Sequence, residues 1–280
     1  MMQSFGANCH PSPSSLTDFG KKLLAEDSNN PGSLGIAISD AIEMVVKSGG
    51  NAKYSLGSVL GHVLMHQTIN GNEAILQMEQ AGDYPDIIVG CTGGGSNLSG
   101  LMFPFLGQQL RGGQKIDIIG CEPLSCPSFT KGKYAYDHGD LAKITPLIKM
   151  HTLGSDFLPP ATHSGGLRYH GMSYHLSHLY DLGLMRAKAY GQKECFEAGI
   201  NFGQQEGIIP APEATHAVKG AIDAALECKE KGESKTILFN LCGHAHFDMS
   251  AYDDYLSGNL AEDIFEEDSA NKSMANLPQV

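Results

Sequence analysis

The sequence predicts an α/β fold in which a parallel β-sheet carries α-helices on both faces. Three short apolar runs, 86–91, 116–121 and 235–241, lack the polar alternation of half-exposed strands, which is typical of strands buried on both faces. Helical patterns separate these runs along the chain, and a glycine-rich turn follows the first run. Because strands that alternate with helices usually pair in parallel, the order of the elements favours this class of fold.

The first 80 residues are predicted to be helical and to contribute no strand to the sheet. The proline- and serine-rich stretch 11–15 opens a helix that reaches about Glu26. Ser33 is placed to cap a second helix, whose apolar positions continue to Val45. A third helical pattern covers 58–81, and we expect it to be bent or weakened near Asn70 and Gly71 and closed by Gly82.

The rest of the chain alternates between strands and helices, apart from a loop-rich region between Pro123 and Gly171. The further elements expected are helices at 96–110, 173–182, 192–205, 213–231 and 250–256, and a strand at 185–190. After residue 257 the sequence becomes acidic, with Glu262 and Asp263 among its carboxylates. We expect this segment, 258–280, to be a disordered tail.

The charge balance excludes some classes of partner. Asp and Glu number 31 against 19 Lys and Arg, which gives a formal net charge of −12 and argues against nucleic-acid binding. No apolar stretch approaches the roughly 18 residues of a membrane span. The first ten residues, from Met1, have neither the basic nor the apolar region of a signal peptide. We therefore expect a cytoplasmic protein with no membrane partner.

The seven cysteines do not form a framework of disulfides or a zinc ribbon. Their number is odd, no CxxC spacing occurs, and several lie inside apolar runs. We interpret them as buried free thiols.

The most specific motif is the glycine-rich turn after the first strand, in which Gly93, Gly94 and Gly95 are followed by Ser96 and Asn97. Glycines let the backbone turn tightly and direct several N–H groups at one anion, and the start of a helix adds its dipole. The alternative is a tight strand–helix turn without a ligand. The turn lacks the lysine of a P-loop and the third glycine of a dinucleotide motif, so a single phosphate group fits it best.

Three other segments carry candidate functional residues. Pro212 and Glu213 begin a helix, where a carboxylate is favoured by the helix dipole, although a simple helix start is an equal alternative. The segment 240–248 follows the third strand, where α/β sheets bind ligands. Its two histidines and aspartate are too few to indicate a metal site. The loop 163–172 has side chains suited to an anionic or aromatic ligand.

Taken together, these segments resemble the tryptophan synthase β chain. The resemblance rests on GGGSN (93–97), EGIIPAPEATHA (206–217), NLCGH (240–244) and HSGGLRYHGM (163–172). The last of these, with LGSVLGHVLMHQT (56–68) and PSPSSLTDFGKKLLAED (11–27), is most similar to the longer, alternative form of that chain. The resemblance runs in order from about Phe5 to Leu256. It implies the fold of pyridoxal-phosphate enzymes that act at Cβ of amino acids.

The resemblance also implies a division of the chain. Residues 1–80 would be the remainder of an incomplete N-terminal domain with its connecting helix. Residues 81–257 would be the C-terminal domain that binds the cofactor phosphate, and the acidic tail would lie outside both.

The resemblance implies roles for individual residues. Gly93, Gly94, Gly95, Ser96 and Asn97 match the loop that binds the phosphate of pyridoxal phosphate, and Glu213 matches a glutamate beside its ring. Cys242 stands where the family has a serine that meets the pyridine nitrogen, and a thiol is the poorer hydrogen-bond partner. The substrate loop would contribute Gly166, Arg168, Tyr169 and His170, with Arg168 at a position where commoner β chains have aspartate. No metal ligand is implied.

The resemblance does not supply the lysine that joins the family's cofactor covalently. The family places this lysine after a histidine in its N-terminal half, and no lysine of this sequence has that setting. The chain therefore resembles the C-terminal part of a lyase that makes L-tryptophan from L-serine and indole, inactive alone, with no catalytic residue assigned. A homo-oligomer or a partner chain with the N-terminal half is expected. A non-catalytic remnant or binding module and another β-replacing enzyme remain alternatives.

Overall fold

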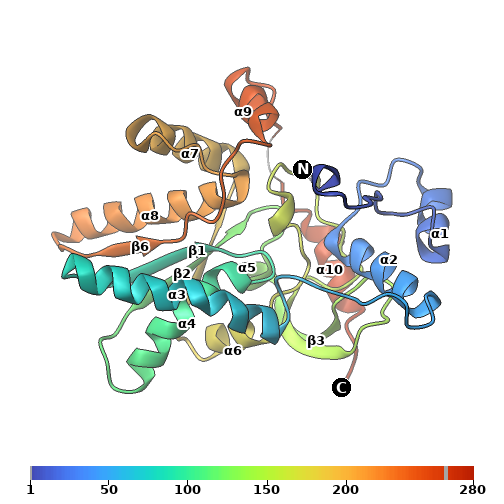
Figure 1. Cartoon of the computed structure of the whole chain (residues 1–280), viewed down its shortest axis with the longest axis horizontal. Coiled ribbons are helices and arrows are strands. Elements are labelled where there is room, and N and C mark those ends of the chain that lie inside the picture. Colours follow the sequence, from blue (N-terminus) through green and yellow to red (C-terminus); the bar gives the residue numbers. More distant parts are fainter. Residues whose placement is uncertain (1, 262–263) are drawn as a thin grey trace.

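The computed structural model describes residues 2–261 and 264–280, and its centre is a four-stranded parallel sheet (Figure 1). The strands stand in the order β5 (Arg186–Tyr190), β2 (Asp117–Pro123), β1 (Ile87–Cys91) and β6 (Ile237–Phe239). β1 pairs with both β2 and β6, so its residues are buried throughout. The parallel sheet expected from the alternation of strands and helices is confirmed.

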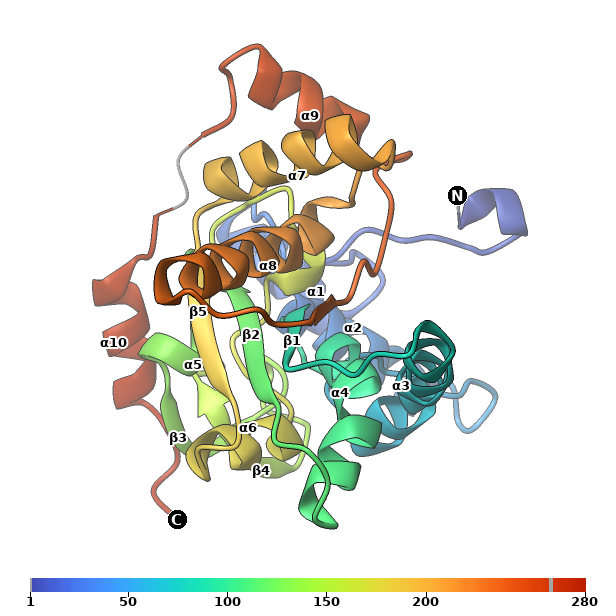
Figure 2. The same ribbon diagram turned by 90° about the vertical axis from the view of Figure 1, so that its left-hand side faces the viewer.

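Helices cover both faces of this sheet, as Figure 2 shows. On one face, Ile88 and Ile118 pack against α3 (Gly61–Ala81), α4 (Ser96–Leu110) and α6 (Tyr174–Asp181). On the other face, side chains one residue along the strands, such as Val89 and Ile119, pack against α7 (Gln192–Glu206) and α8 (Pro212–Lys231). Successive strand residues point to opposite faces, so unbroken apolar runs fill two separate cores.

The third apolar run differs from its expected burial. We expected 235–241 to be buried on both faces, but β6 spans only Ile237–Phe239 and its residues are half-buried. The reason is its place in the sheet, because β6 pairs with β1 alone and forms an edge.

The N-terminal segment is helical, with short 3₁₀ turn η1 (Gln3–Phe5), α1 (Asp18–Glu26) and α2 (Leu34–Lys47). α1 begins later than the serine- and proline-rich stretch suggested, because the Thr17 side chain caps it by accepting a hydrogen bond from Gly20 N. The predicted cap of α2 is confirmed, since Ser33 Oγ accepts from Ile36 N at 3.2 Å.

The helix α3 is continuous through Asn70 and Gly71, where a bend was expected. A β-carbon on Gly71 would collide with Leu101 O and lie 2.7 Å from Gly100 O, and one on Gly100 would lie 2.6 Å from Gln67 Cβ. These glycines therefore allow the close approach of α3 and α4 and do not interrupt the helix.

Replacing Gly71 with valine is expected to destabilise the protein by about 2 kcal/mol, because the added methyl groups must push α3 away from the α4 backbone. Urea unfolding measures this loss. The control is Gly107→Val, since a β-carbon there would contact only the flexible end of Arg111, at 3.4 Å. Equal stability of the two variants would show that the close contact is not needed.

The loop-rich region 123–171 contains more regular structure than expected. It holds α5 (Ser128–Lys131), an antiparallel hairpin of β3 (Lys133–His138) and β4 (Leu147–Thr152), and the short 3₁₀ turn η2 (Gly165–Leu167). The hairpin lies outside the parallel sheet, and only Asp137 of β3 and the last three residues of β4 are buried, so its sequence lacks the apolar run of a buried strand.

The acidic segment after α9 (Met249–Leu256) also differs from expectation. Glu262 and Asp263 lie outside the described residues, as does Met1. Residues 267–275 form α10 (Glu267–Ala275), which buries Ala270 and Met274 in a core with Leu153 and Phe157. Two small or apolar residues one helical turn apart make one packing face, which the density of carboxylates conceals in the sequence.

Within the described ranges, no helix is long and apolar enough to cross a membrane.

Candidate functional site

The glycine loop joins the end of β1 to the start of α4 and is buried. The backbone N–H groups of Gly93, Gly94 and Gly95 make no hydrogen bond with any described residue, whereas Ser96 N donates to Ser58 O at 3.0 Å. Gly95 has a φ of 109°, a conformation that favours glycine. Buried N–H groups normally have a partner, and consecutive N–H groups that no protein atom satisfies can together bind an anion. The loop thus has the donors of the predicted phosphate site.

Segments far away in the sequence enclose this loop. A β-carbon on Gly93 would collide with Gly166 O, and one on Gly94 would collide with Ser58 Oγ and lie 2.6 Å from Val59 Cγ1. Ser173 N donates to Gly94 O at 3.0 Å. Side chains at Gly93 or Gly94 would displace these neighbours, so the closed form of the loop depends on the glycines.

The two polar residues after the glycines differ in their contacts. The Ser96 hydroxyl makes no hydrogen bond to a described residue and stays available to an anion. The Asn97 amide is engaged within the protein, since its Nδ2 donates to Cys91 O and lies 3.1 Å from Cys91 Sγ. Asn240 Nδ2 in turn donates to Asn97 Oδ1. Asn97 therefore ties the loop to the ends of β1 and β6.

Glu213 lies beside the glycine loop, at the start of α8. Its Oε1 accepts a hydrogen bond of 2.9 Å from Gly166 N, and Gly166 O is the neighbour of Gly93 described above. The structure thus brings together Gly93, Gly166 and Glu213, which are separated widely in the sequence.

Cys242 follows β6 and is exposed, and its sulfur lies 3.6 Å from Cys91 Sγ. A hydrogen bond between the two thiols lowers the pKa of Cys242, whereas that bond and burial raise the pKa of Cys91. The carboxylate of Glu213 acts on Cys242 in the opposite direction and raises its pKa. Cys91 and Glu213 therefore act on the pKa of the Cys242 thiol in opposite directions.

The other residues of the predicted substrate loop bind elsewhere. The Arg168 guanidinium donates to Pro160 O at 2.7 Å and to Pro159 O at 2.8 Å, and burial lowers its pKa. Tyr169 donates to Gly139 O at 2.8 Å, and His170 Nε2 lies 2.9 Å from His138 O. Gly166 is therefore the one member of this set with a hydrogen bond to another predicted site residue.

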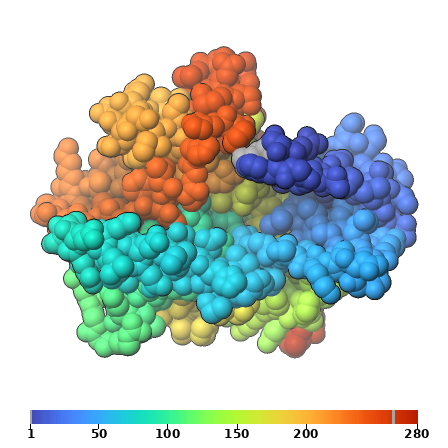
Figure 3. All heavy atoms as spheres, viewed as in Figure 1, coloured from blue at the N-terminus to red at the C-terminus, as the bar shows by residue number. Residues whose placement is uncertain are grey.

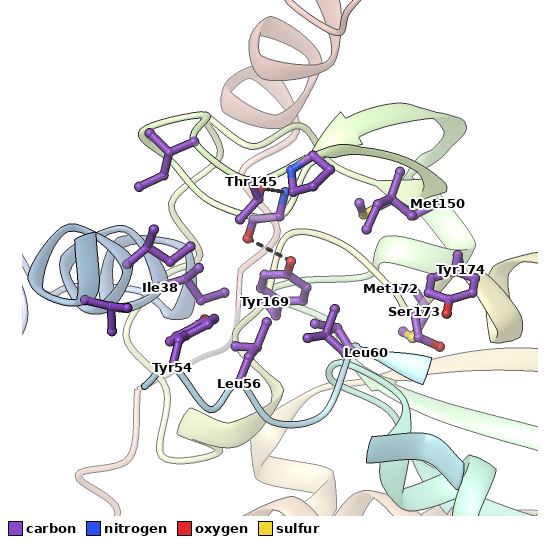
Figure 4. A pocket seen from close by; sticks show the side chains of 17 residues that line it. Ile38, Tyr54, Leu56, Leu60, Thr145, Met150, Tyr169, Met172, Ser173 and Tyr174 are labelled. Atoms are coloured by element: carbon purple, nitrogen blue, oxygen red, sulfur yellow. Dashed lines mark hydrogen bonds between the residues drawn. The ribbon is translucent and has the colours of Figure 1, made fainter. Parts of the chain in front are cut away.

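An apolar cavity of about 290 Å³ adjoins the loop (Figure 4). Its apolar lining includes Ile38, Leu56, Val59, Leu60, Met150 and Met172. Tyr54, from the segment that joins α2 to α3, also lines it, and its buried hydroxyl has no hydrogen-bond partner among the described residues. Burial, with a smaller effect of Asp140, raises the pKa of Tyr54 to about 12, so this hydroxyl stays protonated.

The cavity and the glycine loop share walls. Val59, which lines the cavity, lies against Gly94, and a β-carbon on Gly95 would lie 3.1 Å from Ser173 Oγ and 3.2 Å from Met172 Sδ. The prediction of site residues missed Tyr54, Ser58 and Val59. These residues could have been found from the segment 54–60, which joins two helices and combines small and apolar residues, as the lining of a pocket does.

The family model described as "Pyridoxal-phosphate dependent enzyme" matches residues 1–243. The chain belongs to this family. Pyridoxal phosphate carries a phosphate dianion, and the unpartnered N–H groups of Gly93, Gly94 and Gly95 fit such a group. Within the described residues, no group of three or more His, Cys, Asp or Glu side chains could hold a metal ion.

Among members of the family, the chain is similar to proteins named tryptophan synthase beta chain 2. It is 55% identical over 260 residues to that of Methanosarcina mazei, covering 93% of this chain and 59% of the relative. It is also 55% identical over 265 residues to that of Aquifex aeolicus, covering 94% of this chain and 61% of the relative. The chain thus spans about three fifths of the length of these relatives.

Two solved structures share the fold. A fungal L-serine ammonia-lyase from Rhizomucor miehei has a TM-score of 0.56 at 14% identity, covering 78% of this chain and 65% of that one. The processed threonine deaminase isoform 2 from Solanum lycopersicum has a TM-score of 0.55 at 16% identity, covering 79% and 57%. The expected fold of the pyridoxal-phosphate enzymes is confirmed.

His216 lies one helical turn after Glu213 in α8. It makes the free energy of unfolding of the protein depend on pH. Its Nδ1 lies 3.0 Å from Pro212 O, its buried Nε2 has no partner in the described structure, and burial lowers its pKa to about 4. The unfolded chain therefore binds a proton more readily than the folded chain as pH falls through 6.5. We expect His216 to cost about 2 kcal/mol of stability between pH 7 and pH 5.

Urea unfolding of the wild type and of His216→Gln at both pH values measures this contribution. The variant is expected to lose less stability on acidification, since glutamine does not titrate. An identical loss in the two proteins would contradict the assignment to His216.

Proposed function

We propose that the chain is the cofactor- and indole-binding part of a tryptophan synthase β-type lyase, which makes L-tryptophan from L-serine and indole. The names of the relatives from Methanosarcina mazei and Aquifex aeolicus support the reaction class. The observation that carries the choice of substrate is the apolar cavity beside the glycine loop, into which Tyr54 brings a buried hydroxyl that has no partner among the described residues. Indole has the same character, since it is a planar apolar ring system with one N–H group.

In this proposal, different residues of the chain bind the cofactor phosphate, the cofactor ring and indole. The N–H groups of Gly93, Gly94 and Gly95 and the Ser96 hydroxyl bind the cofactor phosphate, while Glu213 and Cys242 orient the ring. Bound pyridoxal phosphate supplies the electron sink that allows the hydroxyl group to leave Cβ of serine. The cavity excludes water and holds indole close to that carbon, and Tyr54 Oη accepts a hydrogen bond from its N–H group.

The role of Tyr54 is tested by comparing indole with indene, which has the same shape and no N–H group. The chain contains no tryptophan, so indole fluorescence reports the binding of indole directly, and indene is measured by its displacement of indole. We expect the wild type with pyridoxal phosphate to prefer indole by about five- to tenfold, the value of one hydrogen bond. Tyr54→Phe should abolish the preference, and the control Tyr136→Phe, at an exposed tyrosine outside the cavity, should keep it. A preference unchanged in Tyr54→Phe would exclude the contact.

We further expect pyridoxal phosphate to bind this chain without a covalent bond to lysine, because no lysine follows a histidine in the sequence. Borohydride reduction of the loaded protein, followed by mass spectrometry of its peptides, should find no pyridoxyl group on any lysine at stoichiometric level. Dialysis should remove the cofactor completely. One specific lysine that is labelled fully would contradict this prediction and identify the missing residue.

A binding module without catalysis is the second candidate, favoured by the same lack of a histidine–lysine pair. The two candidates differ in co-expression with an N-terminal segment of a tryptophan synthase β chain that carries its lysine. The lyase proposal expects tryptophan to form from L-serine and indole. The side chains of Met65, Ile69 and Leu76 are exposed on one face of α3 and support contact with another chain. The segment that contains α3 runs across the face of the molecule shown in Figure 3. A stable complex that binds the cofactor without turnover would favour the binding module.

A further inference from the structure

The thiols of Cys91 and Cys242 lie side by side, although 150 residues separate the two cysteines in the sequence. Cys91 is the last residue of β1, and Cys242 lies in the turn after the neighbouring strand β6. Their sulfur atoms are 3.6 Å apart, with Cys91 2% exposed and Cys242 open to solvent. A disulfide requires the sulfurs to approach by about 1.5 Å more, and Cys242 lies in a turn outside the strands.

We propose that Cys91 and Cys242 are a redox-modification site, which forms a reversible disulfide when the protein meets a peroxide. The other cysteines fit this role less well. Cys121 is opposite Cys91 on β2 but is fully buried, so neither thiol of that pair meets the oxidant first. Cys9 is partly exposed, and its sulfur contacts a backbone oxygen, Ala7 O, at 3.8 Å.

Exposure and the hydrogen bond between the thiols assign their roles, since Cys242 is open to solvent and Cys91 is buried. The hydrogen bond lowers the pKa of Cys242 and raises that of Cys91, so Cys242 is the thiolate that attacks and Cys91 keeps its proton. The Cys242 thiolate attacks one peroxide oxygen, the O–O bond breaks, and a sulfenic acid and hydroxide form; the hydroxide takes up the proton that Cys242 had released and becomes the first water. Cys91 Sγ then attacks Cys242 Sγ, the S–O bond breaks, and a second water leaves with the Cys91 proton. Two thiols have lost two hydrogens, and one hydrogen peroxide has become two waters.

The disulfide would change the site, and this consequence rests on the proposed function. Cys242 is the residue expected opposite the pyridine nitrogen, and Cys91 Sγ accepts the contact of 3.1 Å from Asn97 Nδ2 at the phosphate loop. Joining the two sulfurs removes the Cys242 thiol and displaces Cys91 Sγ, the sulfur that Asn97 Nδ2 contacts. Oxidation should therefore weaken the binding of pyridoxal phosphate.

The test treats the full chain with hydrogen peroxide, blocks free thiols and digests the protein without reductant. The expected product is a peptide pair joined through Cys91 and Cys242, which dithiothreitol separates. The linkage should be absent in Cys242→Ser and unchanged in the control Cys9→Ser. A Cys242 sulfinic acid beside a free Cys91 thiol, or a Cys91–Cys121 linkage, would overturn the proposal.

A pyridoxal phosphate titration of the same oxidised sample separates the modification from its consequence. Binding at least tenfold weaker than in the reduced protein, with recovery after dithiothreitol, is the expected result. If the linkage forms and the affinity is unchanged, the modification site stands and its effect on the cofactor is wrong. If the reduced protein does not bind pyridoxal phosphate at all, the proposed function fails while the linkage still tests the thiol pair.

Discussion

Replacing Gly94 with aspartate is expected to weaken pyridoxal phosphate binding by about 100-fold or more. The new carboxylate would stand next to a phosphate dianion in a buried loop, where like charges repel strongly. The β-carbon alone would collide with Ser58 Oγ and approach Val59 Cγ1 to 2.6 Å, so the loop would also open. Titration of the variant with pyridoxal phosphate, followed by absorbance, measures the loss.

The control for this prediction is Gly107→Asp, which introduces the same side chain near the other end of α4, the helix that follows the glycine loop. A β-carbon there would contact the Arg111 guanidinium at 3.4 Å, so an added carboxylate has a favourable partner. Cofactor affinity within twofold of the wild type is expected for this control. If Gly94→Asp bound the cofactor as tightly as Gly107→Asp does, the phosphate would have to bind elsewhere.

Replacing Asp140 with alanine is expected to cost about 3 kcal/mol of stability, a larger loss than for any surface carboxylate. Asp140 is fully buried and accepts hydrogen bonds from Ser39 Oγ at 2.8 Å and from Thr145 N at 2.9 Å, as well as from Thr145 Oγ1 and Ile144 N. Removing the carboxylate leaves several donors without their acceptor in a region that joins α2 to the turn before β4.

Urea unfolding of Asp140→Ala is compared with that of Asp156→Ala. Asp156 pairs with Lys143 at 3.2 Å at the surface, so its loss should cost less than about 1 kcal/mol. Thr145 lines the cavity, and we therefore expect Asp140→Ala also to bind indole more weakly. Equal losses for the two aspartates would show that the buried network does not hold this part of the fold.

The sequence predicted the centre of the fold because local signals there agree with the tertiary structure. The apolar runs of β1 and β2 are buried on both faces, and the glycines after β1 lie in a turn that other residues could not adopt without displacing Ser58 or Gly166. Ser33 begins α2 and Gly82 ends α3 as expected, since caps depend on nearby residues.

Contacts between distant segments were less predictable. Nothing local in the sequence shows that Tyr54 and Tyr169 line one cavity, or that Arg168 is held by the carbonyls of Pro159 and Pro160. The helix α10 escaped prediction for a similar reason, because its packing face is small and the core that receives it comes from other parts of the chain. Loops and docked termini take their structure from such partners.

The central claim is that the N–H groups of Gly93, Gly94 and Gly95 bind the phosphate of pyridoxal phosphate. The most direct test is to record the amide resonances of ¹⁵N-labelled protein during titration with pyridoxal phosphate and, separately, with pyridoxal. We predict that the amides of these three glycines shift downfield with pyridoxal phosphate, with inorganic phosphate as a weaker mimic, and stay in place with pyridoxal. Saturable binding of pyridoxal phosphate that leaves the three amides unmoved would contradict the account.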